Sequence, residues 1–322
     1  MAALAGLTAL AAAQPAPSTE LEAVVFRAFP EADAYSCILR DVDQRARTAI
    51  ERRLPFKVHF NELGEHCLVV AFRGRRPVGV IYRRTEEAEW GLTEIAWHLG
   101  LDLRILGFEF VRGRSPWMKT LESSPFAREL AGRDYAQVIA LLDEHESGQR
   151  GDPDDRQDDG LAALQRTTLR SAAKSLAVTD TVWRHEVEKL HDQATGFDLF
   201  PAAARFTRRT ASFELDAAGA HQTIDVKVIY AYDVGTTLLG CVIWSTSNEE
   251  GSEPLRWAVD RELRVMQVVP ERPTRNVGLR KACSRLRGKP LLGLPDADNP
   301  LSPLARGLGA VVPRLAGRRA RR

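Results

Sequence analysis

An internal repeat limits what this chain can fold into. Residues 67–111 and residues 226–271 carry the same order of alternating apolar strands, a glycine, an apolar segment and a basic turn. A repeat of this kind predicts two copies of one structural unit. The equivalent residues of the two copies are Gly79 and Gly240, Thr85 and Thr246, Trp97 and Trp257, Leu103 and Leu263, Arg104 and Arg264, Leu130 and Leu286, and Gly132 and Gly288.

The hydrophobic pattern predicts strands and helices in each copy. Residues 66–72 and 77–84 alternate as paired strands, residues 101–111 form another strand, and residues 90–100 are a short strand or a turn of helix. Helical periodicity runs over residues 21–29, 41–54, 126–145 and 160–191. We therefore predict an α+β fold with two tandem copies of a small antiparallel-sheet-plus-helix unit.

Composition sets the expected domain boundaries. Residues 1–17 look like the apolar core and cleavage site of a secretory signal, cut after Ala13, or like a flexible Ala-rich start. Residues 146–160 are rich in Asp, Gly and Gln, and so predict a mobile acidic linker or loop. The remaining boundaries are 18–145 for the first domain, 161–195 for a connecting helical segment, 196–313 for the second domain and 314–322 for a basic tail. The signal predicts a periplasmic or otherwise exported protein.

Charge and hydropathy exclude some partners. The chain has 45 basic and 43 acidic residues, a net charge of +2, so we expect no nucleic acid as the main partner. The terminal arginine run is a solvated tail or an arm for an anionic partner. The apolar run at the start is shorter than the about 20 residues that a membrane span needs, which predicts no transmembrane span.

The cysteines and histidines do not form a metal motif. The four cysteines, Cys37, Cys67, Cys241 and Cys283, have no CxxC spacing. In an oxidising compartment they would form at most two disulfides, whose pairing the sequence leaves open. His185 and His191 lie six residues apart, which does not place them on one helix face, so no metal site is expected.

The repeat resembles the FMN-binding domain of exported flavin subunits, found in sodium-pumping quinone reductases, Rnf-type electron-transfer complexes and regulators of nitrous-oxide reductase. The shared order is a strand, a glycine-containing turn, a strand, an apolar segment, a strand with an acidic-x-Arg turn, and a helix ending near Leu-x-Gly-Lys/Arg. The matching segments are residues 78–82, 90–110 and 126–134 in the first copy and 238–246, 254–269 and 286–290 in the second.

This resemblance implies an FMN cofactor, bound covalently or non-covalently. In the family a threonine in a small-residue turn receives FMN as a phosphoester. The matching position here is Thr168, with Ser171 as the following hydroxyl, although Arg166 and Thr167 replace the glycine and alanine of the family motif. The alternative is that Thr168 belongs to an amphipathic helix.

Two further residues are candidates for flavin contact. Trp117 lies in the loop where the family faces flavin, and Arg114 nearby is suited to a phosphate. The alternative is that these residues belong to a solvated basic loop without a ligand. Trp97 and Trp257 occupy equivalent positions in both copies, which favours a core role for them.

The function that follows is extracytoplasmic electron transfer with a redox protein or a membrane electron-transfer complex, in which the flavin carries the chemistry. The sequence shows neither a nucleophile with a matching base nor a pair of acidic residues, so nothing in it indicates a hydrolase. The alternative is a non-catalytic binding or scaffold protein that kept the fold and lost the flavin.

Overall fold

The computed structural model of the chain describes residues 19–58, 63–148, 159–217, 220–247, 253–271, 274, 276–292 and 300–317. It divides into two compact units, Met1–His191 and Asp192–Arg322. Each contains a five-stranded antiparallel sheet in which successive strands are neighbours. The predicted α+β fold of two tandem units is therefore confirmed. The predicted signal, residues 149–158 of the linker and residues 318–322 of the tail lie outside the described residues.

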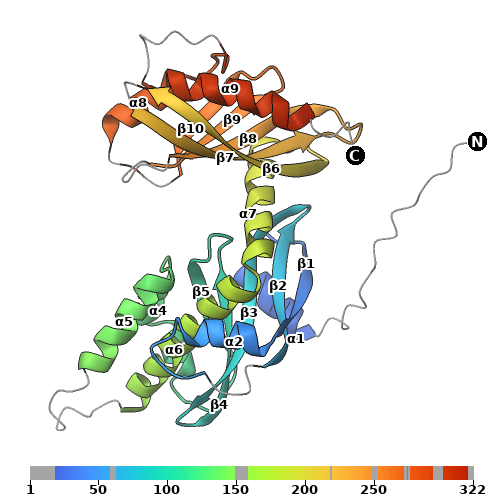
Figure 1. Cartoon of the computed structure of the whole chain (residues 1–322). Helices are drawn as coiled ribbons and strands as arrows, with labels where there is room; N and C mark the ends of the chain where they lie inside the picture. The colour runs from blue at the N-terminus through green and yellow to red at the C-terminus, as the bar shows by residue number, and fades with distance from the viewer. Residues whose placement is uncertain are drawn as a thin grey trace, which may run out of the picture. The chain divides into compact units, whose positions relative to one another are not determined.

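The first unit builds its sheet in the order β1-β2-β3-β4-β5 (Figure 1). The strands are β1 (Ala34–Val42), β2 (Gly64–Arg73), β3 (Arg76–Ala88), β4 (Gly91–Leu99) and β5 (Ile105–Arg112). The helices are α1 (Thr19–Ala28), α2 (Gln44–Glu51), α3 (Met118–Glu122), α4 (Pro125–Leu130), α5 (Tyr135–Gly148) and α6 (Asp159–Val182).

The second unit builds its sheet in the order β10-β9-β8-β7-β6. Its strands are β6 (Arg205–Ala217), β7 (Ala220–Tyr232), β8 (Leu238–Ser247), β9 (Leu255–Asp260) and β10 (Val265–Pro270). Its helices are α8 (Val277–Ser284) and α9 (Ser302–Gly317), and the division between the units falls within α7 (Arg184–Leu199).

Both faces of the first sheet are covered. One face carries the larger core, in which Val80, Tyr82 and Trp97 pack with α6 residues such as Leu169 and Leu176. The other face packs Val69, Ala71 and Ile81 against α1. Because α6 contributes to the first core, the segment expected to be a connection between domains belongs largely to the first unit.

Several elements differ from the sequence-based expectation, among them β1, which was not expected, and the helix expected over 160–191, which is divided into α6 and α7. For residues 90–100 the strand is the correct one of the two alternatives: they contain β4, because alternate residues such as Ile95 and Trp97 enter the core. The helix expected over 41–54 is shorter, since β1 runs to Val42 and Asp43 caps α2 by accepting from Ala46 N at 2.7 Å.

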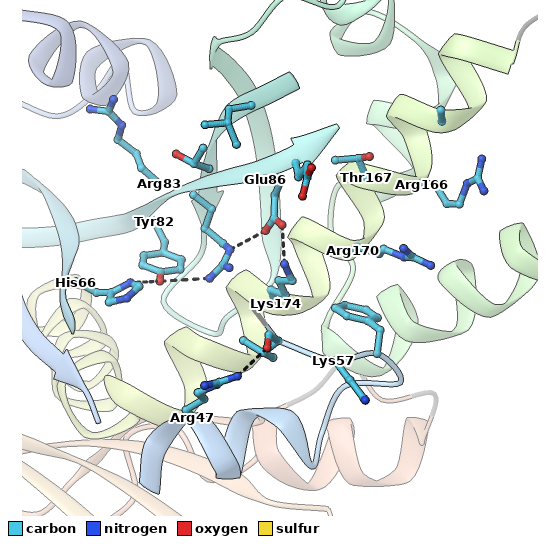
Figure 2. Close-up of a pocket in the computed structure, with 17 residues that line it drawn as sticks. Arg47, Lys57, His66, Tyr82, Arg83, Glu86, Arg166, Thr167, Arg170 and Lys174 are labelled. Carbon is cyan, nitrogen blue, oxygen red and sulfur yellow. Dashed lines mark hydrogen bonds and ion pairs between the residues drawn. The ribbon is translucent and has the colours of Figure 1, made fainter. Parts of the chain in front are cut away.

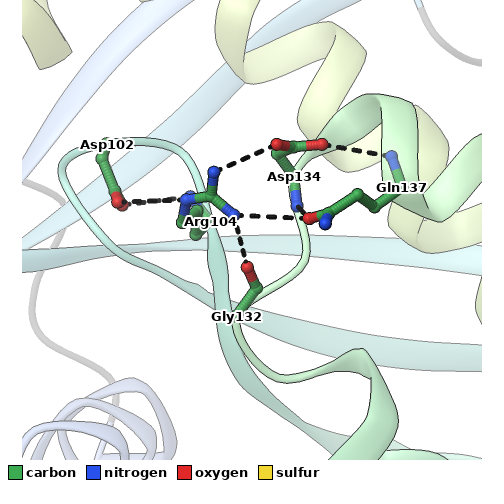
Figure 3. A network of polar contacts seen from close by, with 5 residues as sticks. All are labelled: Asp102, Arg104, Gly132, Asp134 and Gln137. Atoms are coloured by element: carbon green, nitrogen blue, oxygen red, sulfur yellow. Dashed lines mark hydrogen bonds and ion pairs between the residues drawn. The ribbon is translucent and has the colours of Figure 1, made fainter. Parts of the chain in front are cut away.

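The helix expected over 126–145 is broken into α4 and α5. The break contains Gly132, whose φ of 81° lies in the left-handed region that glycine adopts without strain. Its carbonyl accepts from Arg104 Nη1 at 2.7 Å, and Arg104 also pairs with Asp134 at 3.1 Å (Figure 3). The break thus anchors the start of β5 to the start of α5.

The repeat is confirmed at the level of single hydrogen bonds. Leu103 and Leu263 both have a φ of 59° and both donate their amide to the residue three positions earlier. Gly132 N donates to Ile105 O at 2.7 Å, and Gly288 N donates to Val265 O at 2.7 Å. The two tryptophans at equivalent positions of β4 and β9 are completely buried, which confirms their core role.

A further equivalence was missed by sequence analysis. Phe29 follows α1 and packs under Gly79, while Phe200 follows α7 and packs under Gly240. The helix end, the phenylalanine, a proline and the next strand follow in the same order in both units. The repeated unit therefore includes the helix before the sheet.

Candidate functional site

The first unit contains a basic cavity of about 960 Å³ between its sheet and α6 (Figure 2). It is lined by the C-terminal half of β3, the segment after α2 and one side of α6. Its basic side chains are Arg47, Lys57, Arg83, Arg84, Arg166, Arg170 and Lys174, and its acidic side chains are Glu86 and Glu87. Positive charge therefore exceeds negative charge at this place, whereas the whole chain is nearly neutral.

Regular secondary structure brings these charges to one place. Tyr82, Arg84 and Glu86 alternate along β3 and share the face that packs on α6. On α6, the cations Arg166, Arg170 and Lys174 recur every fourth residue, which places them along one side of the helix. The cavity is thus positioned by a strand and a helix, which hold side chains more rigidly than loops do.

The buried carboxylate of Glu86 links the two elements. Arg84 Nε donates to it at 3.0 Å and Lys174 Nζ donates to it at 2.6 Å. The side chains of Arg84, Glu86 and Lys174 are only 3%, 8% and 12% exposed. One carboxylate therefore meets two cations in a poorly solvated site.

A second contact fixes the orientation of Arg84. The hydroxyl of Tyr82 lies 2.7 Å from His66 Nδ1 and 3.5 Å from Arg84 Nη1. Tyr82 is itself fully buried and packs against Trp183. The guanidinium of Arg84 is therefore held between an acid and a buried hydroxyl before any ligand arrives.

Three of the lining arginines have unmet donors. The Nε atoms of Arg47, Arg83 and Arg166 are buried and have no hydrogen-bond partner among the described residues. Buried donors are almost always paired in folded proteins, with protein groups, with water or with a ligand. An oxygen-rich ligand in this cavity would supply acceptors for them.

The second unit has a cavity at the equivalent place, with different chemistry. Its volume is about 340 Å³. Counting from the equivalent glycines, Ser245 and Ser247 of β8 stand where β3 has Arg84 and Glu86, and both line the smaller cavity. Apolar residues make up much of the remaining lining: Leu215, Ile224, Leu255, Leu279, Leu301 and Leu304. Among the described residues, no basic side chain lines this smaller cavity.

The two hydroxyls predicted to hold flavin are buried in α6. Thr168 is 0% exposed, and its Oγ1 donates to Leu164 O at 2.8 Å. Ser171 is also 0% exposed, and its Oγ accepts from Trp97 Nε1 at 2.9 Å. Attachment of FMN requires a hydroxyl on an exposed turn, so the expected position of Thr168 on such a turn is wrong. The alternative that Thr168 is a helix residue is correct.

The other two predicted residues lie elsewhere in the first unit. Trp117 precedes α3 and packs partly buried against the main core, beside Gly160 at the start of α6. Arg114 is exposed in the loop after β5. None of the four predicted site residues lines the basic cavity.

Sequence reasoning missed the basic cavity, although two signals for it are present. Arg84 and Glu86 continue the inward alternation of β3, where apolar residues would otherwise be expected. The cations of α6 recur at a spacing of four. Either signal alone is common on solvated surfaces, and only their meeting in space identifies a site.

The described part of the chain contains no helix long and apolar enough to cross a membrane. Within the same residues, no cluster of three or more His, Cys, Asp or Glu side chains is placed to hold a metal ion. Comparison with protein-family models, with curated proteins and with solved structures finds no match for this chain.

Proposed function

We propose that this protein is a non-catalytic binding protein whose first unit holds a small anionic molecule in the basic cavity. The observation that carries the proposal is the pairing of Arg84 and Lys174 with a single buried carboxylate, together with the unpaired Nε of Arg166, which lines the same cavity. Fold alone does not specify function, so the proposal rests on this site.

The chemistry of the lining favours a phosphate ester as the anion. Arginine presents a planar fork of donors that matches phosphate oxygens, and lysine adds a point charge. The volume of about 960 Å³ is at the upper end of the range for small-molecule sites. Phe56 and Leu92 also line the cavity and offer apolar surface to the rest of the molecule.

A flavin carrier in extracytoplasmic electron transfer is the second candidate. FMN carries a phosphate ester and a flat ring, and thus combines the charge and the apolar surface that this lining complements. Because Thr168 is buried, we propose non-covalent binding for this candidate. For this flavin candidate we also propose a redox partner and export to the periplasm.

Calorimetric titration with two matched ligand pairs tests these proposals. Adenosine monophosphate is compared with adenosine, and FMN with riboflavin, since each pair differs only in the phosphate. We expect both phosphate esters to bind, both neutral partners to bind at least tenfold more weakly, and affinity to fall with rising salt. Binding of FMN and riboflavin alone would replace the anion-binding proposal with the flavin one. Binding of none of the four would overturn both.

A matched pair of variants locates the site. Arg166→Gln removes a cation from the cavity, and we expect it to weaken binding of the phosphate esters about ten- to hundredfold, because a charged hydrogen bond is lost. Arg128→Gln removes an exposed cation of α4 outside the cavity and is expected to leave the affinity unchanged. Equal effects of the two variants would contradict the proposed location.

A further inference from the structure

Two of the four cysteines lie on neighbouring strands of the first unit. In the antiparallel register of β1 and β2, Cys37 is opposite Val69 and Leu39 is opposite Cys67. The two cysteines are therefore diagonal neighbours on one face of the sheet. This is the face covered by α1, and both side chains pack at the edge of the core there.

The two thiols interact and are partly accessible. The hydrogen bond from the Cys67 thiol lowers the pKa of Cys37 to about 7. The same bond, together with burial, raises the pKa of Cys67. Both side chains are only partly buried. A thiol of low pKa beside a second thiol is the arrangement of a reactive cysteine with a resolving cysteine.

The cysteines of the second unit provide an internal contrast. Cys241 is 1% exposed and Cys283 is 4% exposed. Burial raises the pKa of both thiols. They are expected to stay unreactive as long as the second unit is folded.

We propose that Cys37 and Cys67 form a redox-modifiable pair, which closes a reversible disulfide between β1 and β2 by exchange with a low-molecular-weight disulfide. The Cys37 thiolate attacks one sulfur of that disulfide, which releases one thiolate and leaves a mixed disulfide on Cys37. Cys67 then loses its proton and attacks the sulfur of Cys37, which releases a second thiolate. The protein loses two electrons and two protons, and the small disulfide is reduced to two thiols.

The position of β1 permits the bond to close. Diagonal neighbours have Cα atoms about 7–8 Å apart, slightly more than the about 4.4–6.8 Å of most disulfides. A small shift of one strand is therefore needed. Strand β1 is the edge of its sheet, and β2 is its only neighbour among the described strands of that sheet, so it can move without breaking another ladder.

The test exposes the reduced, folded full chain to a series of ratios of oxidised to reduced glutathione. Free thiols are then blocked by alkylation, and the protein is digested with trypsin for mass spectrometry. We expect residues 28–40, which contain Cys37, to become linked to residues 58–73, which contain Cys67. The link should disappear on return to reduced glutathione, and Cys241 and Cys283 should be alkylated only after unfolding.

Single substitutions test the two steps. Cys67→Ser should trap glutathione on Cys37, because the thiol that would displace it is missing, and neither Cys67→Ser nor Cys37→Ser should form the link between the two peptides. Circular dichroism checks that each variant is folded. The proposal is overturned if Cys37 and Cys67 are alkylated separately at every ratio in the wild type, or if Cys37 of the Cys67→Ser variant takes up no glutathione at any ratio.

Discussion

The two units have the same framework and opposite chemistry at equivalent positions. Both bury a tryptophan in the fourth strand, both turn through a leucine of positive φ, and both bond a glycine after the next helix to the fifth strand. At the end of the third strand, however, the first unit has Arg84 and Glu86 where the second has Ser245 and Ser247. Equivalent cavities are consequently basic in one unit and largely apolar in the other.

The partner of the buried indole shows how the two sites diverged. Trp97 Nε1 donates to Ser171 on α6 at 2.9 Å, whereas Trp257 Nε1 donates to Ser245 on the neighbouring strand at 2.9 Å. In the first unit arginine occupies the strand position that supplies this acceptor in the second. The framework thus tolerates exchange at strand ends as long as the buried donor remains satisfied.

The largest effect is expected at Glu86, where one substitution should lower stability and raise affinity for the ligand. Glu86→Gln removes the carboxylate between Arg84 and Lys174, and it should lower the free energy of unfolding of the first unit by about 3–5 kcal/mol, because buried cations lose their partner. The same change should raise affinity for phosphate esters. Chemical denaturation measures the free energy of unfolding, and calorimetry measures the affinity for the phosphate ester. The double variant Arg84→Ser/Glu86→Ser serves as the comparison, and its affinity should fall.

A smaller difference in stability is expected between alanine substitutions at the two equivalent glycines. In Gly240→Ala the new Cβ would overlap the carbonyl of Val259, and the φ of 158° is strained for alanine. We expect a loss of about 2–4 kcal/mol in the second unit. Gly79→Ala overlaps mainly the ring of Phe29, which can shift, so about 1–3 kcal/mol is expected in the first. Hydrogen exchange within each unit measures the two losses, and the reverse order would contradict this account.

The smallest effect concerns the acceptors of the two indoles. Ser171→Ala and Ser245→Ala each leave a buried N–H unpaired, and each should cost about 1–3 kcal/mol of stability. Ser171→Ala should also weaken ligand binding, because Ser171 fixes the helix that carries Arg170 and Lys174. Ser245→Ala should not change binding. Equal binding by both variants would show that α6 is positioned without this bond.

The framework could be predicted from sequence because its residues are required by the local backbone conformation or by the alternation of a strand. Gly132 and Gly288 are needed for a left-handed turn, and Trp97 and Trp257 continue the apolar alternation of their strands. Strand β1 escaped prediction, because most of its residues are only partly buried and it carries no clear alternation.

The site could not be predicted in the same way. Glu86 and Lys174 are 88 residues apart in sequence, and only the packing of α6 on β3 brings them together. The resemblance to flavin-binding domains led instead to Thr168, whose hydroxyl faces its own helix. A motif read without its helix context therefore pointed to a buried residue, whereas the cations on the same helix line the cavity.

Hydrogen–deuterium exchange with bound phosphate ester tests the central claim most directly. The full chain is measured with and without saturating adenosine monophosphate or FMN, whichever binds more tightly. We predict slower exchange in residues 76–88 of β3 and 163–174 of α6, and no change in residues 238–247 of β8 or 302–317 of α9. Protection confined to β8 and α9, or equal protection in both units, would contradict the assignment of anion binding to the first unit.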